Sequence, residues 1–108
     1  MTQLTYTPAP YTDHFIDVGG IKLHYQDFGT AGKPPMLCIH GSAAHGHWFD
    51  FVAAGFTNDY HVIAPDMRGH GDSDWDQSAT PEYNYERYAA DVHALTKKLD
   101  LRDFILVG

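Results

Sequence analysis

The stretch that decides the fold of this 108-residue chain reads Asp66-Met67-Arg68-Gly69-His70-Gly71-Asp72-Ser73. It opens a polar segment, residues 66–81, that has no hydrophobic period. A loop of this length inside a compact domain is usually functional or structurally specialised. Two glycines permit tight backbone turns, and an acid and an arginine can fix the loop by charge-assisted hydrogen bonds. We therefore expect a structural loop built by Asp66, Arg68, Gly69, Gly71 and Ser73.

Apolar runs on both sides of this loop predict an α/β arrangement. Residues 36–39, 60–64 and 104–107 are short and unalternating, as in strands that are covered on both faces. Earlier in the chain, residues 14–18 and 21–25 flank two glycines, which is a strong signal for a β-hairpin. The order of hairpin, strand, helix, strand, helix and strand implies a mostly parallel sheet in one domain without an internal boundary.

Two helices are expected between these strands. Over residues 48–57, an apolar stripe that should face the core is formed by Trp48, Phe51, Val52 and Phe56. The second helix has the clearest pattern, with Asn84 as its N-cap and a stripe formed by Tyr85, Tyr88, Val92, Leu95 and Leu99. On that helix, His93 falls on the less apolar face and is expected to point to solvent.

Composition bounds the class of protein. The chain is 44% hydrophobic and 19% charged, as in ordinary globular proteins. Seven basic and 14 acidic residues give a net charge of −7, which disfavours a nucleic-acid partner. The apolar runs are far shorter than the roughly 20 residues needed to cross a membrane. Residues 1–6 lack the basic and apolar regions of a secretory leader, so we expect a cytoplasmic protein. The lone Cys38 is expected to be a small buried hydrophobe.

A second motif, His40-Gly41-Ser42, follows the first buried strand. In open α/β sheets, ligands bind at the carboxyl ends of strands, near the switch in strand order. A tetrahedral intermediate needs backbone N–H donors that point at its developing oxyanion. After a sharp turn at Gly41, the N–H of Ser42 can point into such a site. Taken by itself, the motif is read first as a plain glycine turn at the end of a strand.

Together the two motifs resemble the α/β-hydrolase family. They are about 25 residues apart, with one helix and one strand between them, and Leu106-Val107-Gly108 falls where the family's Gly-x-Ser-x-Gly nucleophile elbow begins. The resemblance covers the chain from about His14 onward. It implies the N-terminal part of an α/β-hydrolase sheet, a β-hairpin followed by parallel strands with crossover helices, which is incomplete without C-terminal elements.

The function that the resemblance implies is that of a serine hydrolase acting on a carboxylic ester, a lactone or a similar acyl bond. His40 and Gly41 would shape the oxyanion loop, the N–H of Ser42 would be a catalytic donor, and Gly108 would start the elbow. The nucleophile, the acid and the catalytic histidine have no matching positions here. The implied partners are a small-molecule substrate and the C-terminal remainder of the fold, and no cofactor is implied. Residues 1–108 alone are therefore predicted to be unstable and inactive.

Two alternatives remain open. Dehalogenases and epoxide hydrolases of the family use an aspartate nucleophile and often place a proline two residues after the His-Gly pair, where this chain has Ala43. That difference favours serine mildly, and the residue two positions beyond Gly108 would distinguish the two enzymes. The other alternative is a non-catalytic half-domain that needs a complementing chain, since residues 104–107 would form an exposed apolar edge.

The other histidines suggest a pocket more than a metal site. His45, His47 and Trp48 are expected to line the edge of the substrate pocket or, with equal weight, to be solvated loop residues. A zinc site needs three or four converging ligands, which the spacing of these histidines does not supply, so no metal is expected. His70 is expected on the loop surface. A dinucleotide site at Gly69-x-Gly71 is excluded, because Asp74 replaces the third glycine and no helix begins there.

Overall fold

The computed structural model describes residues 7–108, so the expectation about residues 1–6 lies outside the described residues. The chain begins its sheet with a hairpin of β1 (Thr12–Val18) and β2 (Ile21–Gly29). These strands are antiparallel and place Val18 opposite Ile21 across the two glycines, as predicted. β2 continues past the predicted end at residue 25, and this extension pairs it with β4 (His61–Pro65).

The remaining strands give the sheet the order β1-β2-β4-β3-β5. β3 (Pro35–Cys38) is parallel to β4 on one side and to β5 (Ile105–Val107) on the other. Within residues 7–108, β2 runs against the other four strands, so the sheet is mixed but mostly parallel in direction. The chain leaves β3 towards β4 and later returns to the opposite side of β3. The switch in strand order therefore lies at the carboxyl end of β3.

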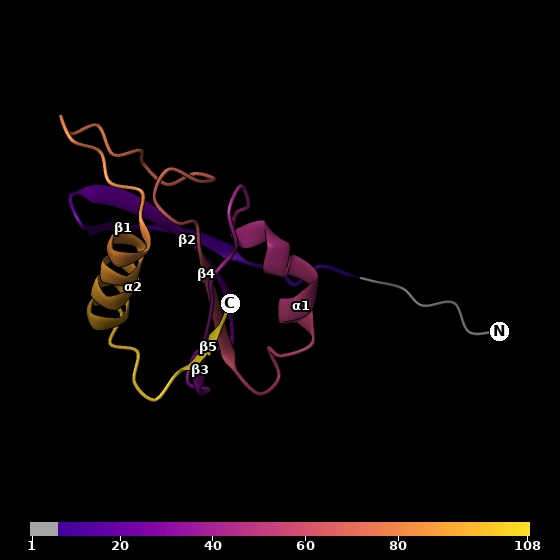
Figure 1. Ribbon diagram of the computed structural model, residues 1–108. Coiled ribbons are helices and arrows are strands. Elements are labelled where there is room, and N and C mark those ends of the chain that lie inside the picture. The colour runs from indigo at the N-terminus through magenta and orange to yellow at the C-terminus, as the bar shows by residue number, and fades with distance from the viewer. Residues whose placement is uncertain (1–6) are drawn as a thin grey trace.

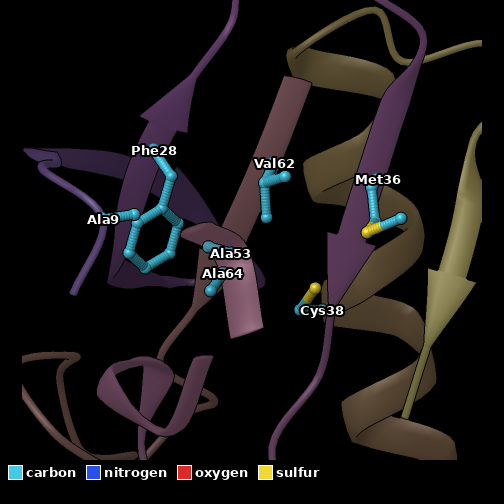
Figure 2. Packing of buried hydrophobic residues seen from close by; sticks show 7 residues of the cluster. All are labelled: Ala9, Phe28, Met36, Cys38, Ala53, Val62 and Ala64. Carbon is cyan, nitrogen blue, oxygen red and sulfur yellow. The ribbon is translucent and has the colours of Figure 1, made fainter. Parts of the chain in front are cut away.

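The helices lie on opposite faces of this sheet (Figure 1). Alternate residues of the central strands supply a core to each face, which is why their sequences do not alternate. On the side of α1 (Asp50–Ala54), Figure 2 shows one buried cluster. Its members are Ala9, Phe28, Met36, Cys38, Ala53, Val62 and Ala64. On the side of α2 (Tyr85–Lys98), the buried cluster contains Val18, Ile21, Leu23, Leu37, Ile63 and Leu95. Cys38 is buried as predicted, and burial raises the pKa of its thiol to about 11.

α2 has the predicted cap and core residue. The side chain of Asn84 accepts a hydrogen bond from the N–H of Arg87 at 2.8 Å, and Leu95 is fully buried. His93 is exposed, as expected. The stripe differs at its first position, because Tyr85 is 88% exposed where the first turn of the helix extends beyond the core. Asp91 is buried, which the pattern did not predict.

The predicted helix over residues 48–57 is wrong in extent and in orientation. The structure has a 3₁₀ helix, η1 (Gly46–Phe49), followed by the five-residue α1. All four members of the predicted stripe are exposed, Trp48 by 63%. The small residues Gly46 and Ala53 face the sheet instead. The close approach at Gly46 requires a glycine, since a Cβ there would lie 2.7 Å from Gln26 Oε1 and 2.8 Å from the carbonyl oxygen of Ala64.

β5 forms an exposed apolar edge, as expected. Ile105 and Leu106 are both exposed, and within the described residues β5 pairs with β3 alone. No helix in residues 7–108 is both long enough and apolar enough to cross a membrane.

Candidate functional site

His40 joins the two motif loops at the carboxyl ends of β3 and β4. Its Nε2 accepts a hydrogen bond from the N–H of Met67 at 2.9 Å, so its Nδ1 carries the proton and donates to the carbonyl oxygen of Gly41 at 2.7 Å. The side chain is buried, and burial lowers its pKa. A neutral imidazole is the form that can accept from Met67. His40 thus ties the turn containing Ser42 to the loop that follows β4.

Asp66 forms a second tie between the same loops. One oxygen, Oδ1, accepts from the N–H of Gly46 at 2.6 Å, while Oδ2 accepts from the N–H of Asp72 at 2.9 Å and from His24 Nδ1 at 2.7 Å. Burial by itself raises the pKa of this carboxyl, but these donors outweigh it and lower the pKa below its usual value. The carboxylate therefore serves as a buried acceptor for three segments of the chain.

Arg68 points away from this junction and is held by a different set of groups. Its Nε and Nη2 donate to the two oxygens of Asp91, at 2.7 and 3.0 Å, in a bidentate pair. Nη1 donates to Asp76 at 3.1 Å and Nη2 to the carbonyl oxygen of Gly19 at 3.0 Å. The hydrogen bonds to Asp91 raise the pKa of the guanidinium. The residue joins the hairpin turn, the loop and α2.

The remaining loop residues have the backbone geometry and contacts of a tight turn. Gly69 and Gly71 both have positive φ, and a Cβ at Gly71 would lie 2.3 Å from Asp66 Oδ2. Ser73 Oγ donates to the carbonyl oxygen of Asp66 at 2.6 Å and accepts from the N–H of His24 at 2.8 Å. The hydrogen bonds and turns expected of this loop are therefore present in the structure.

A hollow of about 370 Å³ lies beside the Ser42 turn. Its lining includes His40, Gly41, Ser42, His70, Tyr85 and Tyr88. His70 is half-buried and lies with its ring centroid 5.0 Å from that of His40, so it contributes to the hollow as well as to the loop surface on which it was expected. Its Nδ1 donates to the carbonyl oxygen of Arg68 at 2.9 Å.

His45, His47 and Trp48 do not line this hollow, contrary to the pocket-edge expectation. All three are exposed, which agrees with the alternative of solvated loop residues. His47 Nδ1 lies 3.0 Å from Asp50 Oδ2, and its ring packs edge-on against Tyr11. In this region the buried residue of η1 is Gly46, whose N–H is bound by Asp66.

Gly108 lies next to the Ser42 turn because β5 is parallel to β3. Val107 is opposite Cys38, and the N–H of Ile39 donates to the carbonyl oxygen of Val107 at 2.8 Å.

Ala43, the residue directly after Ser42, has a φ of +59°, in the left-handed region that a residue with a side chain seldom adopts. Strained backbone of this kind is concentrated at functional sites.

One group of potential metal ligands is present in residues 7–108, formed by His24, Asp66 and Asp72. Their ligand atoms lie within 4.8 Å of one another. The Asp66 oxygens and the His24 nitrogens already take part in hydrogen bonds, so a cation here would have to displace N–H donors. The geometry therefore fits a hydrogen-bonded junction better than a metal centre.

The sequence analysis missed three residues that take part in the hydrogen-bond networks of Asp66 and Arg68. His24 and its contact Asp13 lie in the hairpin, and Asp91 lies on α2. In a strand, His24 falls on the face opposite Leu23, where a polar residue predicts exposure. The burial of His24 is explained by its contact with Asp66, which lies 42 residues away in the sequence.

A family model described as the alpha/beta hydrolase fold matches residues 34–108. The chain is 38% identical over 90 residues to a non-heme chloroperoxidase of Streptomyces lividans, covering 82% of this chain and 32% of that protein. It is 33% identical over 81 residues to a 3-hydroxybutyrate-oligomer hydrolase of Cupriavidus necator, covering 74% of this chain and 27% of the relative. An alpha/beta hydrolase from Novosphingobium aromaticivorans superposes with a TM-score of 0.83 at 30% identity, over 93% of this chain and 35% of that one. The chain thus spans about a third of the length of the proteins it matches.

Proposed function

Because this chain belongs to the alpha/beta hydrolase fold family, we propose that it forms part of a serine hydrolase that cleaves a carboxylic ester, a lactone or a similar acyl bond. The observation that carries the proposal is the placement of the Ser42 turn and Gly108 at the carboxyl ends of adjacent parallel strands. A side chain two residues beyond Gly108 would lie beside the N–H of Ser42. A nucleophile and an oxyanion donor would thereby share one site.

The proposed reaction follows the family mechanism. A serine beyond Gly108 attacks the carbonyl carbon, and its proton passes to a histidine that a carboxylate orients. The negative charge that develops on the carbonyl oxygen is stabilised by the N–H of Ser42 and by that of the residue after the nucleophile. The neutral His40 and the ionised Asp66 keep the Ser42 turn in place during these steps. The substrate is a small molecule that enters through the hollow beside this turn.

Two relatives support particular activities. The Cupriavidus relative is named for hydrolysis of 3-hydroxybutyrate oligomers, in which hydroxy acids are joined by ester bonds, and this favours ester cleavage. The Streptomyces relative is named a non-heme chloroperoxidase, and its 38% identity makes chloroperoxidase activity the second candidate. Both names concern proteins of which the matched segment covers only 32% and 27%.

The turn after His40-Gly41 differs from the proline pattern of the aspartate-nucleophile relatives. Proline cannot adopt a positive φ, and Ala43 has a φ of +59° at the position where those relatives often have proline. The residue two positions beyond Gly108 provides the direct test. Serine there supports the proposal, whereas aspartate would overturn ester cleavage in favour of dehalogenase or epoxide hydrolase chemistry.

We also propose that the active protein includes C-terminal elements of the same fold. The exposed edge of β5 can pair with another strand, and the hollow between β5 and α2 is mostly apolar. The intact mass of the protein isolated from its natural source tests this directly. Residues 1–108 expressed alone should show no cooperative unfolding and no turnover of a p-nitrophenyl ester. Cooperative unfolding with turnover by that segment would contradict the proposal.

A backbone substitution tests the oxyanion role of Ser42. In the complete protein, Ser42→Ala keeps the N–H and should retain ester turnover close to that of the wild type. Ser42→Pro removes the N–H and should lower kcat by about 10²–10³-fold, as the loss of one oxyanion donor does elsewhere. Circular dichroism controls for folding of both variants. Equal turnover by the two variants would exclude the Ser42 N–H as a donor.

A further inference from the structure

His24 is a buried histidine outside the two motifs. It lies in β2 and is 1% exposed. Its Nδ1 lies 2.7 Å from Asp66 Oδ2, and its Nε2 lies 2.7 Å from Asp13 Oδ1. Its own N–H donates to Ser73 Oγ at 2.8 Å. Side chain and backbone together connect the hairpin to the loop that follows β4.

The two carboxylates require both ring nitrogens to donate, which is the charged form of histidine. Asp13 faces the ring from β1 and Asp66 from the loop after β4, and a carboxylate oxygen of Asp72 lies within 4.8 Å of a ring nitrogen. The ring of Phe15 covers another side at a centroid distance of 5.1 Å. Burial alone would lower the pKa of His24, but Asp13 and Asp66 raise it above its ordinary value.

The two contacts of His24 are not equivalent. The side chain of Asp13 is 57% exposed, so water can solvate it when it leaves the ring. Asp66 is buried, and its other oxygen holds the N–H of Gly46, four residues after Ser42. A rotation of the Asp66 carboxylate would therefore release the anchor of the Ser42 turn. Two contacts within residues 7–108 oppose this rotation at Oδ2, the N–H of Asp72 from the loop and Nδ1 of His24 from the hairpin.

We propose that His24 is a positioning residue whose Nδ1–H fixes the Asp66 carboxylate and, through the anchored N–H of Gly46, holds the Ser42 turn. The link from Nδ1 to Gly46 is independent of the enzyme's activity. The last step, the orientation of the Ser42 N–H towards an oxyanion, rests on the proposed hydrolase function.

Two amide variants separate the contacts of the ring. In His24→Asn, the side-chain amide nitrogen occupies the approximate place of Nδ1 and can still donate to Asp66. In His24→Gln, the amide nitrogen lies near the place of Nε2 and can donate to Asp13 instead. The exposed His14 supplies a control, since His14→Gln alters a histidine of the same hairpin without touching Asp66.

The main measurement is amide hydrogen exchange of Gly46 by NMR in the complete protein. We expect His24→Asn and His14→Gln to match the wild type, and His24→Gln to exchange at Gly46 about ten times faster or more, as expected for the loss of a hydrogen bond to a charged group. The kcat for a p-nitrophenyl ester should fall in His24→Gln with KM unchanged, and His24→Asn should restore it. Equal Gly46 exchange in the two His24 variants would overturn the proposal.

The wild-type protein gives a second measurement in case His24→Gln does not fold. The ¹⁵N shifts of the His24 ring should show Nδ1 protonated from acid to alkaline pH, with Nε2 the nitrogen that loses its proton. Loss of the proton from Nδ1 would overturn the proposal. If the wild type turned over no ester, the proposed function would fail, while Gly46 exchange and the ring shifts would still decide the role of His24.

Discussion

The loop of residues 66–73 is polar and largely buried, whereas the helical segment of residues 48–56 is rich in aromatic side chains and largely exposed. Each segment is the reverse of what hydropathy alone predicts. In the loop, Asp66, Arg68 and Ser73 are buried because every one of them has several hydrogen-bond partners. Within and just before the helical segment, the buried inner positions are Gly46 and Ala53, and a Cβ at Gly46 would lie 2.7 Å from Gln26 Oε1.

The difference shows that these two regions depend on different interactions. The loop depends on a connected set of charges and N–H donors, which is costly to leave incomplete. The exposed stripe contributes little to the packing of the described residues. Substitutions should therefore have large effects in the loop and small effects in the stripe, and the four predictions below test that order in the complete protein.

The largest loss of stability is expected for Asp91→Ala. This change leaves the buried guanidinium of Arg68 without its bidentate partner, since Asp76 makes a single hydrogen bond. Removal of one partner from a buried ion pair costs about 3–5 kcal/mol. The free energy of unfolding from urea denaturation measures the effect. Glu86→Ala, at an exposed site on the same helix, is the control and should change it by less than about 0.5 kcal/mol. Equal losses would contradict the role given to the pair.

A smaller loss is expected for Gly71→Ala. The alanine would adopt a φ of +50° and place its Cβ 2.3 Å from Asp66 Oδ2. A left-handed backbone at a residue with a Cβ costs about 1–2 kcal/mol of stability, and displacement of the Asp66 side chain adds to this cost. Gly20→Ala is the matched control, because its φ is +80° and the space around it is open. Thermal denaturation should show a greater loss for Gly71→Ala; equal losses would indicate that Asp66 is not held there.

Two buried histidines should give opposite pH dependence. The folded state lowers the pKa of His40 below the ordinary 6.5, so its contribution is present above pH 6.5 and is lost as pH falls through the lowered value. The folded state raises the pKa of His24, so its contribution is complete below pH 6.5 and is lost as pH rises through the raised value. Unfolding free energies of His40→Gln and His24→Asn across pH, relative to wild type, should diverge in these directions. Parallel profiles would contradict the assigned charge states.

The smallest effect is expected for Phe51→Gln. Phe51 is exposed on α1, and exposed substitutions usually change stability by less than about 0.5 kcal/mol. Ala53→Val, two residues further on the buried face, should cost about 1–3 kcal/mol through overpacking. Differential scanning calorimetry compares the two. A loss above about 1.5 kcal/mol for Phe51→Gln would mean that other parts of the complete protein cover the stripe.

Local signals were sufficient for much of this fold. The glycine pair defined the hairpin, the unalternating runs defined the three parallel strands, and period and cap together defined α2. These features depend on neighbours in sequence. The prediction of a helix over residues 48–57 was wrong because it could not include the contact of Gly46, whose N–H bonds to Asp66 twenty residues later.

Only those residues of the candidate site that belong to a recognisable sequence motif could be predicted. His40, Gly41 and Ser42 lie at the end of β3 beside the hollow, where the sequence placed them. The role of Ser42 as a donor remains a prediction. The burial of His24 and Asp91 could not be predicted, because their partners lie 42 and 23 residues away and helix or strand periodicity reports only on nearby residues.

The contacts of Arg68 also have a consequence for how the protein folds. One guanidinium joins Gly19 in the hairpin turn, Asp76 in the loop and Asp91 on α2. A partly folded chain that had assembled the hairpin and the loop without α2 would lack the bidentate partner of this guanidinium. Such intermediates are raised in free energy, while the state with all three segments in place is not. Arg68 should therefore make the hairpin, the loop and α2 fold together as a single cooperative unit.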